Sequence, residues 1–444
     1  MGVRPFTIGK IDLLWIHAIL AFLAFCYILV SVSLFIGVSR LRRNTGHKTQ
    51  DGSQAGMPVP PGLESRVLSL ESGAGNLPFV SVLVAARNEE RAIADCLESL
   101  VQQQYPSDRY EIVVVNDRST DNTPSIIKNY MGKYKAIKYV SIDSNSSGLT
   151  GKQNALNEGL KLCAGEIILN TDADCIAGPL WVRRTVSYFV PQVGLTVGFS
   201  TVYNTKAKGQ RPKNSMLYAL HSMLRGLFAH LQSLDMLFLM DAAAGTIGMN
   251  APVSCLGRNL AYRKAILDDI GYSGMGYTIT EDAALIQAVA KKTNWDIAVV
   301  YDKAAAVLTF AEESIKQFLS QRVRWVLGGQ ATRSWLQIPL YASFLFHLCL
   351  AISFPLMFFA RSLIAVTLVC VFVKVILDFV RCWRVCREFE RADLLRLFVP
   401  YEIFMIYYSL LTGFGSMFIR KVRWKGVEYT RGKSYTPLRV TRNQ

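Results

Sequence analysis

The sequence predicts an α/β domain with a mostly parallel sheet, held at a membrane by apolar helices. Between residues 79 and 170, short β-rich runs alternate with helical segments, a rhythm typical of parallel strands joined by crossover helices. Segments of about twenty apolar residues, long enough to cross a bilayer, lie before and after this domain. Hydrophobic residues make up 51% of the 444-residue chain, which is high for a soluble enzyme.

The alternating region predicts the elements of the sheet in order. Four strands are expected at residues 79–86, 110–117, 137–142 and 166–170, with helices between them at 90–103, 124–131 and 153–162. Further strands are expected at residues 194–203 and 295–301, and an amphipathic region at 314–335. Residues 216–251 are apolar but contain His230, Asp235 and Asp241, which favours a helix packed on the sheet, or a ceiling over a substrate site, over a membrane span.

The first apolar segment, residues 13–36, is predicted to be a retained membrane anchor. It is followed by Arg40, Arg42 and Arg43, whereas a signal peptide would end in small residues at a cleavage site. The positive-inside rule places this basic flank in the cytoplasm and the short N-terminus outside. We therefore expect an integral protein of the cytoplasmic (inner) membrane, with the α/β domain facing the cytoplasm.

Three later apolar segments, at residues 338–360, 362–380 and 397–419, create a conflict of topology. Three spans after a cytoplasmic domain would leave the C-terminal tail outside, yet residues 420–444 are strongly basic and should lie inside. Either one of the three is an interfacial or re-entrant segment, or two of them form a tight hairpin around Arg361. The sequence leaves both alternatives open.

These segments divide the chain into five predicted parts. They are an N-terminal transmembrane anchor at 1–39, a flexible linker at 40–78, the α/β domain at 79–335, membrane segments at 336–419 and a basic cytoplasmic tail at 420–444. The linker is assigned because residues 44–78 are polar and rich in Gly, Ser and Pro.

The net charge of +16 indicates membrane lipids rather than nucleic acid as partners. The basic residues gather beside the apolar segments, at residues 40–43, 381–396 and 420–442, where they suit anionic headgroups. No basic helix with interleaved aromatic residues and no zinc-ligand spacing is apparent in the sequence, so no nucleic acid is expected. The nine cysteines are scattered, which is typical of buried thiols in a reducing compartment.

The most informative run is residues 167–174, in which an apolar strand ends in two acids. Asp172 and Asp174 are two residues apart, so the alternation of a strand aims both side chains to one side. Ligands of α/β sheets bind at the C-terminal ends of strands. Two carboxylates there suit Mg²⁺ or Mn²⁺, which leave coordination sites open for phosphate oxygens. Most such acid pairs are solvated turns, so the accompanying acids decide the interpretation.

Other acids also lie near strand ends or turns. Glu89 follows the first predicted strand, Asp117 ends the second, and Glu281 and Asp282 precede a helical run. Each alone is compatible with a helix cap or a solvated turn, and Asp282 in particular with a first-turn acid. Together with the pair at 172 and 174, they are expected to converge on one rim of the sheet.

With these residues in order, the segment 79–325 resembles the family-2 glycosyltransferases of GT-A fold, specifically the membrane-integrated branch. That branch includes cellulose, hyaluronan and poly-N-acetylglucosamine synthases and the ceramide-glucosyltransferase-like enzymes. The motifs that carry the resemblance are Arg87-Asn88-Glu89, Asn116 to Asp121, Gly151-Lys152, Asp172-Ala173-Asp174, Gly257 to Arg263, Thr280-Glu281-Asp282 and the Gln-x-x-Arg-Trp motif Gln321 to Trp325. Together they are specific for the family but say little about the substrate.

The resemblance implies a role for each candidate residue. The donor would be a UDP-sugar, with Asp174 coordinating Mg²⁺ or Mn²⁺ at its diphosphate. Asp282 would be the general base that takes a proton from the acceptor hydroxyl, so that the anomeric configuration inverts. The residues expected to bind the nucleotide-sugar are Glu89, Asp117, Lys152, Asp172, Gln321, Arg324 and Trp325, with Glu89 and Asp117 on uracil and ribose. Those expected on the acceptor side are Gly257, Asn259 and Glu281, where Arg258 would narrow or charge the pocket.

Two of these roles have competing interpretations. Lys152 would place a cation near the diphosphate, but a solvated lysine at a helix start explains it equally well. Arg324 can reach pyrophosphate and Trp325 can stack on the acceptor sugar, although Trp and Arg also favour the membrane surface as anchors. The accompanying motifs favour the ligand role for Arg324 and Trp325, whereas the two interpretations of Lys152 stay open.

The predicted function is an inverting, metal-dependent transfer from a UDP-sugar to a membrane-associated acceptor. A lipid acceptor is favoured because the predicted spans are few and residues 422–429 are similar to tails of lipid-directed relatives. A processive polysaccharide synthase is the alternative, although export by so few helices would require an oligomer or a partner subunit. A catalytically silent membrane scaffold is a second alternative, disfavoured because Asp174 and Asp282 are both retained.

Overall fold

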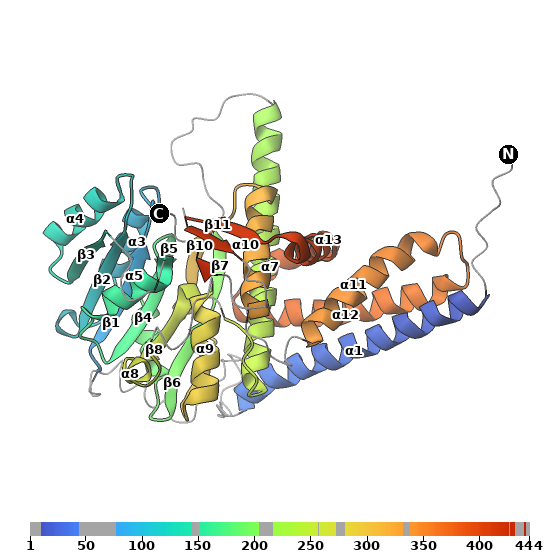
Figure 1. Cartoon of the computed structure of the whole chain (residues 1–444), viewed down its shortest axis with the longest axis horizontal. Helices are drawn as coiled ribbons and strands as arrows, with labels where there is room; N and C mark the ends of the chain where they lie inside the picture. Colours follow the sequence, from blue (N-terminus) through green and yellow to red (C-terminus); the bar gives the residue numbers. More distant parts are fainter. Residues whose placement is uncertain are drawn as a thin grey trace.

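The computed structural model describes residues 10–43, 77–143, 149, 151–203, 216–255, 257–271, 280–331, 338–425, 427–430 and 439–440. Helices α1 (Lys10–Arg43), α11 (Ile338–Leu356) and α12 (Leu363–Glu388) extend side by side away from an α/β domain (Figure 1). Helix α1 continues past the predicted anchor boundary at residue 39. Most of the predicted linker lies outside the described residues, so its flexibility stays a prediction.

A seven-stranded sheet forms the α/β domain. Its strands, in spatial order, are β3 (Ile137–Ile142), β2 (Tyr110–Asp117), β1 (Val80–Ala86), β4 (Ile167–Asp172), β8 (Leu260–Arg263), β6 (Val193–Gly198) and β9 (Asp296–Val300). Strand β8 runs antiparallel to both of its neighbours, and the other pairs in this sheet are parallel. The predicted mostly parallel sheet is confirmed, and its first four predicted strands correspond to β1, β2, β3 and β4.

Strands in the middle of the sheet are apolar on both faces because both faces are covered. In β1, Val80, Val82 and Val84 pack into one buried cluster, whereas Leu83 packs into the other. The remaining helices of the domain are α3 (Ile93–Val101), α4 (Thr123–Lys133), α5 (Gly151–Leu160), α6 (Trp181–Ser187), α8 (Ala265–Ile270), α9 (Glu281–Lys292) and α10 (Ile315–Ala331). Strands β1, β2 and β4 run parallel to one another, so their C-terminal ends lie at one edge of the sheet.

A second sheet corrects one predicted strand. It consists of β5 (Cys175–Ala177), β10 (Val307–Phe310) and β7 (Ser200–Tyr203). The single strand expected at residues 194–203 is wrong, because the chain leaves the main sheet at Phe199 and continues as β7. The ring of Phe199 is fully buried, with its centroid 4.7 Å from that of Tyr301 and 4.3 Å from that of Phe389. These aromatic contacts hold the chain where it passes from one sheet to the other.

Helix α7 (Met216–Gly248) is continuous and packs against β7, α1 and α12. It meets α1 at glycines: a Cβ on Gly37 would lie 2.0 Å from the carbonyl oxygen of Gly245, and one on Gly248 would lie 2.0 Å from that of Gly37. Larger side chains at these positions would push the two helices apart. Small residues thus fix the α1 anchor directly against the α/β domain.

Among the described residues, three helices are long and apolar enough to cross a membrane. They are Leu14–Leu41, Leu363–Glu388 and Ala392–Phe418, and Leu340–Leu356 in α11 is a shorter apolar helix. Helices α11 and α12 form a hairpin beside α1, joined by residues 357–362, which include Arg361 (Figure 1). Helix α13 (Phe398–Phe418) is seen nearly end-on in Figure 1, so it lies crosswise to α1 and α12.

One side of α13 is apolar and exposed. Val399, Ile403, Tyr407 and Leu411 recur every four residues, and their exposed fractions are 66%, 56%, 63% and 59%. The opposite side, which includes Tyr408, is buried against the protein. This pattern is typical of a helix that lies along a surface and shows one stripe to an apolar medium.

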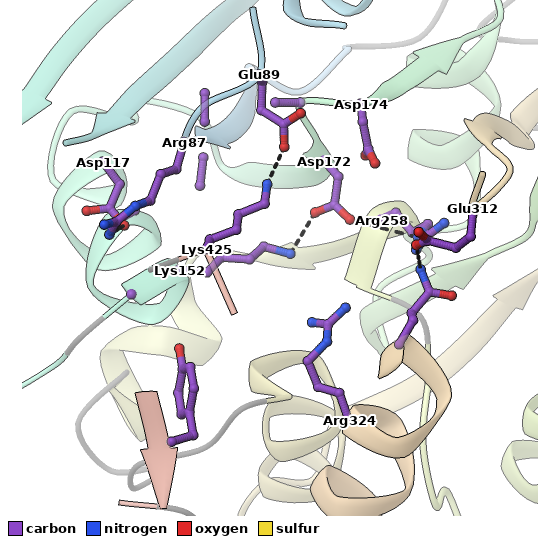
Figure 2. Close-up of a pocket in the computed structure, with 17 residues that line it drawn as sticks. Arg87, Glu89, Asp117, Lys152, Asp172, Asp174, Arg258, Glu312, Arg324 and Lys425 are labelled. Carbon is purple, nitrogen blue, oxygen red and sulfur yellow. Dashed lines mark hydrogen bonds and ion pairs between the residues drawn. The ribbon is translucent and has the colours of Figure 1, made fainter. Parts of the chain in front are cut away.

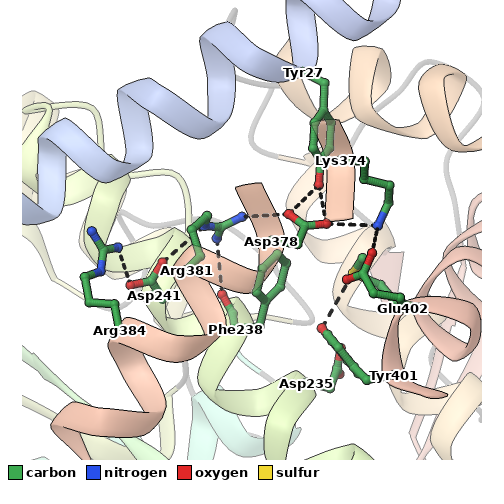
Figure 3. Close-up of polar contacts among 11 residues, drawn as sticks. Tyr27, Asp235, Phe238, Asp241, Lys374, Asp378, Arg381, Arg384, Tyr401 and Glu402 are labelled. Atoms are coloured by element: carbon green, nitrogen blue, oxygen red, sulfur yellow. Dashed lines mark hydrogen bonds and ion pairs between the residues drawn. The ribbon is translucent and has the colours of Figure 1, made fainter. Parts of the chain in front are cut away.

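Buried charged side chains join the apolar helices (Figure 3). Lys374 of α12 donates to Asp378 one turn later at 2.9 Å and also pairs with Glu402 of α13. The Tyr27 hydroxyl of α1 donates to the same Asp378 carboxylate at 2.6 Å. Because each charge has a partner, the group can stay buried without an uncompensated ion.

Nearer the α/β domain, α12 is tied to α7 by a second buried ion cluster. Arg381 and Arg384 approach the Asp241 carboxylate at 3.2 and 2.6 Å (Figure 3). Asp241 is fully buried, so both contacts are shielded from water. Asp241 therefore pairs with two arginines of α12, and Asp235, the other acid in the apolar run of α7, pairs with Arg322 of α10.

The predicted tail at 420–444 is folded where it is described. Strands β11 (Lys421–Trp424), β12 (Val427–Thr430) and β13 (Arg439–Val440) form an antiparallel sheet. Val422 and Tyr429 pack on Val323 and Leu327 of α10. This contact brings the turn between β11 and β12 back to the α/β domain.

Candidate active site

The C-terminal ends of β1, β2 and β4 open into a cleft lined by both carboxylates and cationic side chains (Figure 2). The predicted site residues that line it are Glu89, Asp117, Lys152, Asp172, Asp174, Gln321 and Arg324. Additional charged or aromatic lining residues are Arg87, Arg258, Glu312, Lys425 and Tyr429. The structure thus brings the acids of three strand ends together.

Lys152 lies in the first turn of α5, at the acidic side of the cleft. Its ammonium is 2.7 Å from the Asp172 carboxylate and 2.8 Å from that of Glu281. Burial would raise the pKa of Asp172, but Lys152 and Arg258 outweigh burial and hold that pKa well below its usual range. Asp172 is therefore an anion at neutral pH. Lys152 is a paired cation inside the cleft, not a solvated lysine.

Asp172 and Asp174 form the cleft's candidate metal centre. A carboxylate oxygen from each and the sulfur of Cys175 lie within 4.8 Å of one another. Sulfur is a soft donor that Mg²⁺ and Mn²⁺ do not favour over oxygen, so Cys175 is a poor ligand for these ions. The remaining oxygen donors suit a hard cation such as Mg²⁺ or Mn²⁺.

The opposite end of the cleft combines Asp117 with two arginines. Arg118 and Arg87 lie 2.8 and 3.4 Å from the Asp117 carboxylate. The turns after β1 and β2 contain Asn88 at φ 55° and Arg118 at φ 53°, a left-handed conformation uncommon for residues other than glycine. Such strained positions often occur at binding sites, where neighbouring contacts hold them.

Glu89 is paired with a residue from the far end of the chain. Its carboxylate accepts a hydrogen bond from the Lys425 ammonium, which comes from the turn between β11 and β12 (Figure 2). Burial raises the pKa of Glu89, and Lys425 opposes this rise. Lys425 itself has φ 47°, as a two-residue turn between paired Trp424 and Val427 requires.

Asp282 lies beside the cleft, where it lines a smaller cavity with Glu281 and Gly257. Its carboxylate accepts hydrogen bonds from the backbone N–H of Gly257 at 2.6 Å and of Ala283 at 2.8 Å. Burial and the neighbouring Glu281 raise the pKa of Asp282 to about 6. A carboxylate with this pKa exchanges a proton near neutral pH, as a general base must. Of the predicted acceptor-side residues, Gly257 therefore hydrogen-bonds to Asp282, and Glu281 forms an ion pair with Lys152.

Asn259, a predicted acceptor-side residue, makes its side-chain hydrogen bonds within the protein. Its carbonyl oxygen accepts from the Trp181 indole at 2.9 Å, and its amide nitrogen donates to the carbonyl oxygens of Phe199 and Ala305, both at 2.8 Å. The side chain is 2% exposed. Asn259 therefore joins the two sheets at the point where the chain passes between them.

Trp325 is not among the residues that line the cleft, and its contact with substrate stays a prediction. The Arg322 guanidinium covers its ring at 4.2 Å from the centroid. Gln321 and Arg324 from the same helix do line the cleft. The structure thus separates two residues of the motif from Trp325, whose face is already covered by a cation.

Arg258, which was expected to narrow or charge the pocket, lines the cleft together with Glu312, whose position the sequence did not reveal. Arg258 donates to the Thr309 hydroxyl at 3.0 Å and lies 3.8 Å from Asp172, so it charges the acidic side of the cleft. Glu312 accepts from the Gln321 amide at 2.6 Å. Burial raises the pKa of Glu312, and Arg258 opposes this rise. The motif Gly-Arg-Asn drew attention to Arg258, whereas no sequence signal distinguished Glu312.

Two family models match the chain. Residues 81–264 match "Glycosyl transferase family 2", and residues 215–377 match "Glycosyl transferase family group 2". The first range contains the ends of β1, β2 and β4, and the second contains α10. The matched residues therefore include most of the cleft.

Curated relatives cover the same region. A beta-monoglucosyldiacylglycerol synthase from Nostoc sp. is 31% identical over 260 residues, which is 57% of this chain and 50% of the relative. A poly-beta-1,6-N-acetyl-D-glucosamine synthase from Staphylococcus epidermidis is 29% identical over 272 residues, 60% of this chain and 58% of the relative. The chain thus spans about half the length of the curated relatives it matches.

One solved structure resembles nearly the whole chain. A mannosyltransferase from Pyrobaculum calidifontis, in complex with GDP-mannose and Mn²⁺, has a TM-score of 0.51 at 16% identity. The match covers 91% of this chain and 99% of that one. At this identity the likeness concerns the fold, and the GT-A fold predicted from the sequence is confirmed.

Proposed function

Because the chain belongs to glycosyltransferase family 2, we propose that it transfers a sugar from a UDP-sugar to a membrane-associated acceptor, with inversion at the anomeric carbon. The observation that carries this proposal is the arrangement of the cleft. The acid pair Asp172 and Asp174 faces the cations Lys152, Arg258 and Arg324 across a space suited to a small ligand. A nucleoside diphosphate bound with a divalent cation combines both kinds of charge.

The donor occupies the cleft from Asp117 to Asp174. Asp117 and Glu89 accept hydrogen bonds from ribose and uracil at one end. Lys152 and Arg324 neutralise diphosphate oxygens in the middle, where Arg324 offers a planar fork of donors. Gln321 completes the wall at the far end.

A divalent cation, Mg²⁺ or Mn²⁺, would be held by Asp174 with Asp172 nearby. When bound, it offsets the charge that develops on the departing diphosphate. The protein's own contribution is to bring the two carboxylates together at the end of β4 and to keep Asp172 ionised. Lys152 and Arg258 do this for Asp172 by lowering its pKa.

Asp282 is the proposed general base. It takes the proton of the acceptor hydroxyl as the new glycosidic bond forms and the bond to the diphosphate breaks. Direct displacement from the opposite face inverts the anomeric configuration. A pKa near 6 leaves most of this carboxyl ionised at pH 7.

The membrane arrangement supports an acceptor at the bilayer surface. We propose that α1 and α12 cross the membrane together with the shorter α11, whose 19 residues suffice for a crossing. Helix α13 is also long enough to cross, but we place it along the cytoplasmic face with its apolar stripe toward lipid, because it lies crosswise to α1 and α12 (Figure 1). Three crossings place the N-terminus outside and both the α/β domain and the tail inside. This arrangement resolves the conflict between the tail charge and the number of apolar segments.

A lipid is the favoured acceptor. Three crossing helices are few for a polymer channel, and the relatives include a synthase named for a glucosyldiacylglycerol. A processive polysaccharide synthase is the second candidate, since another relative is a poly-N-acetylglucosamine synthase. An oligomer would be needed to build a channel in that case.

Transfer from labelled sugar nucleotides tests the proposal. Native membranes that contain the chain are incubated with Mn²⁺ and each of several radiolabelled UDP-sugars or GDP-mannose, and are then extracted with organic solvent. Discrete labelled species in the organic phase indicate a lipid acceptor, and high-mass aqueous label indicates a polymer. Membranes with Asp282→Asn are the control. Label from GDP-mannose alone would contradict the uridine assignment.

A further inference from the structure

A chain of buried contacts leads from α13 to the wall of the cleft. It begins at Asp235 of α7, which is fully buried. One carboxylate oxygen accepts hydrogen bonds from the hydroxyls of Tyr408 at 2.5 Å and Tyr401 at 3.2 Å, both on α13. The other accepts from Arg322 of α10 at 2.5 and 3.1 Å. Asp235 thus joins three helices through one side chain.

Arg322 carries the chain of contacts toward the cleft. Its third nitrogen donates to the Gln321 side-chain oxygen at 2.6 Å, and the Gln321 amide donates to Glu312 at 2.6 Å. The Arg322 guanidinium lies between two rings, 4.3 Å from the Phe318 centroid and 4.2 Å from that of Trp325. These contacts leave the guanidinium little freedom to turn. Its donors are therefore aimed at Asp235 and Gln321 together.

A second set of hydrogen bonds also connects helix α7 to Glu312 in the cleft wall. The buried Gln232, one turn before Asp235, donates to the Glu312 carbonyl at 3.0 Å and accepts from the Glu312 N–H at 2.9 Å. Glu312 is thus fixed through its backbone by Gln232 and through its carboxylate by Gln321. Its carboxylate lies near Arg258 in Figure 2. Both supports begin on α7, away from the cleft.

We propose that Asp235 is a positioning residue for the donor cleft, which fixes Gln321 and Glu312 through Arg322 and couples them to α13. The proposal rests on the proposed function in one respect, because the ligand of this wall is taken to be a nucleoside diphosphate. Displacement of α13 would loosen the hydroxyl contacts of Asp235. The orientation of Gln321 would then change without any direct contact between α13 and the ligand.

The Asp241 pair provides a matched control. Asp241 lies on the same helix, is equally buried and is paired with Arg381 and Arg384 of α12, but these contacts lead away from the cleft. Loss of either acid should destabilise the protein, because a buried arginine loses its partner. Only loss of Asp235 should change the cleft wall.

Four variants of the full chain, purified in nanodiscs, test the proposal: Asp235→Asn, Arg322→Lys, Tyr408→Phe and Asp241→Asn. Arg322→Lys keeps a cation for Asp235 but lacks the fork that reaches Gln321 as well. Tyr408→Phe removes a single hydroxyl, so it is informative even if Asp235→Asn fails to fold. Hydrogen exchange of residues 315–331 is measured first, because it needs no ligand. Calorimetric titration with UDP and Mn²⁺ follows.

We expect the variants at 235, 322 and 408 to exchange faster across residues 315–331 than wild type, and to bind UDP about two- to tenfold more weakly. Asp241→Asn should lower Tm but retain wild-type exchange in this segment and wild-type UDP affinity. Equal effects of the 235 and 241 variants would overturn the positioning role. Wild-type protein that fails to bind UDP would instead overturn the proposed donor, while exchange would still decide the positioning role.

Discussion

Replacing Lys152 by Met removes a cation that two carboxylates share. The ammonium lies 2.7 Å from Asp172 and 2.8 Å from Glu281, and the side chains of the lysine and the two acids are 17%, 28% and 12% exposed. A hydrogen bond between charged groups contributes about 1.5–3 kcal/mol, so the two together are worth about 3 kcal/mol after partial screening by solvent. We expect Lys152→Met to fold with a lower Tm. If Lys152 also contacts the diphosphate, UDP affinity should fall about a hundredfold.

The same substitution should shift the pH dependence of transfer in a defined direction. Burial and Glu281 raise the pKa of Asp282 to about 6, and Lys152 opposes this rise. Asp282 accepts a proton only when ionised, so kcat of the wild type should fall as the pH drops through about 6. Without Lys152, the pKa of Asp282 rises further. The acidic limb of the kcat profile should therefore move to higher pH.

The assay is kcat against pH at saturating donor, together with calorimetric titration with UDP. Lys161→Met is the matched control. Lys161 comes directly after the last residue of α5, its side chain is 58% exposed, and it forms an ion pair with Glu158 of that helix. It should retain the wild-type profile and affinity. An acidic limb that stays in place or moves to lower pH in Lys152→Met would refute the electrostatic link to Asp282. Unchanged UDP affinity would refute the contact with the diphosphate.

Three further substitutions test individual roles. Asp282→Asn should still bind UDP but lose transfer by a factor of about a thousand, and normal turnover would remove the general-base role. For Asp174→Ala, UDP affinity and Mn²⁺ stimulation should fall together in titrations with and without metal; full metal stimulation in this variant would count against the metal assignment. Lys425→Met should weaken UDP binding about tenfold by loss of a charged contact at the cleft, whereas Lys421→Met, which removes the pair with Glu428 on the same hairpin, should not. Equal affinities of these two variants would show that the hairpin tip is not part of the donor site.

The sheet and the acids at its edge could be predicted because both depend on local sequence. Alternation along each strand and the polar residues that follow it determine where a strand ends and which way its last side chains point. Asp117 and Asp172 therefore lie where the sequence placed them, and Asp174 joins them at the cleft although β4 ends at Asp172 and Asp174 follows in a turn. The same reasoning extends to Lys152, since it opens the helix that follows β3.

The remainder depends on contacts between distant parts of the chain. Asn259 belongs to a family motif, but its amide nitrogen donates hydrogen bonds to the carbonyl oxygens of Phe199 and Ala305. No local sequence pattern connects these residues to Asn259. Lys425 lies 336 residues from its partner Glu89, within a segment whose charge suggested only membrane topology. Trp325 was assigned by motif alone, and its ring is covered by Arg322 from the preceding turn. Long-range polar partners thus decided the positions of Asn259 and Lys425, whereas Trp325 is covered by a neighbour on its own helix.

The polar contacts between the apolar helices also constrain how the protein assembles. If α12 crosses the membrane as proposed, it carries the pair Lys374 and Asp378 with it, and charged side chains in lipid are costly unless they are paired. Tyr27 is synthesised 351 residues before Asp378, so the hydroxyl that donates a hydrogen bond to this carboxylate is already in place when α12 is made. Glu402 arrives later and completes the group around Lys374. Because Lys374 and Asp378 already pair within α12, Tyr27 and Glu402 complete a group that α12 begins by itself, and we expect these neighbours to favour its packing against α1 and α13.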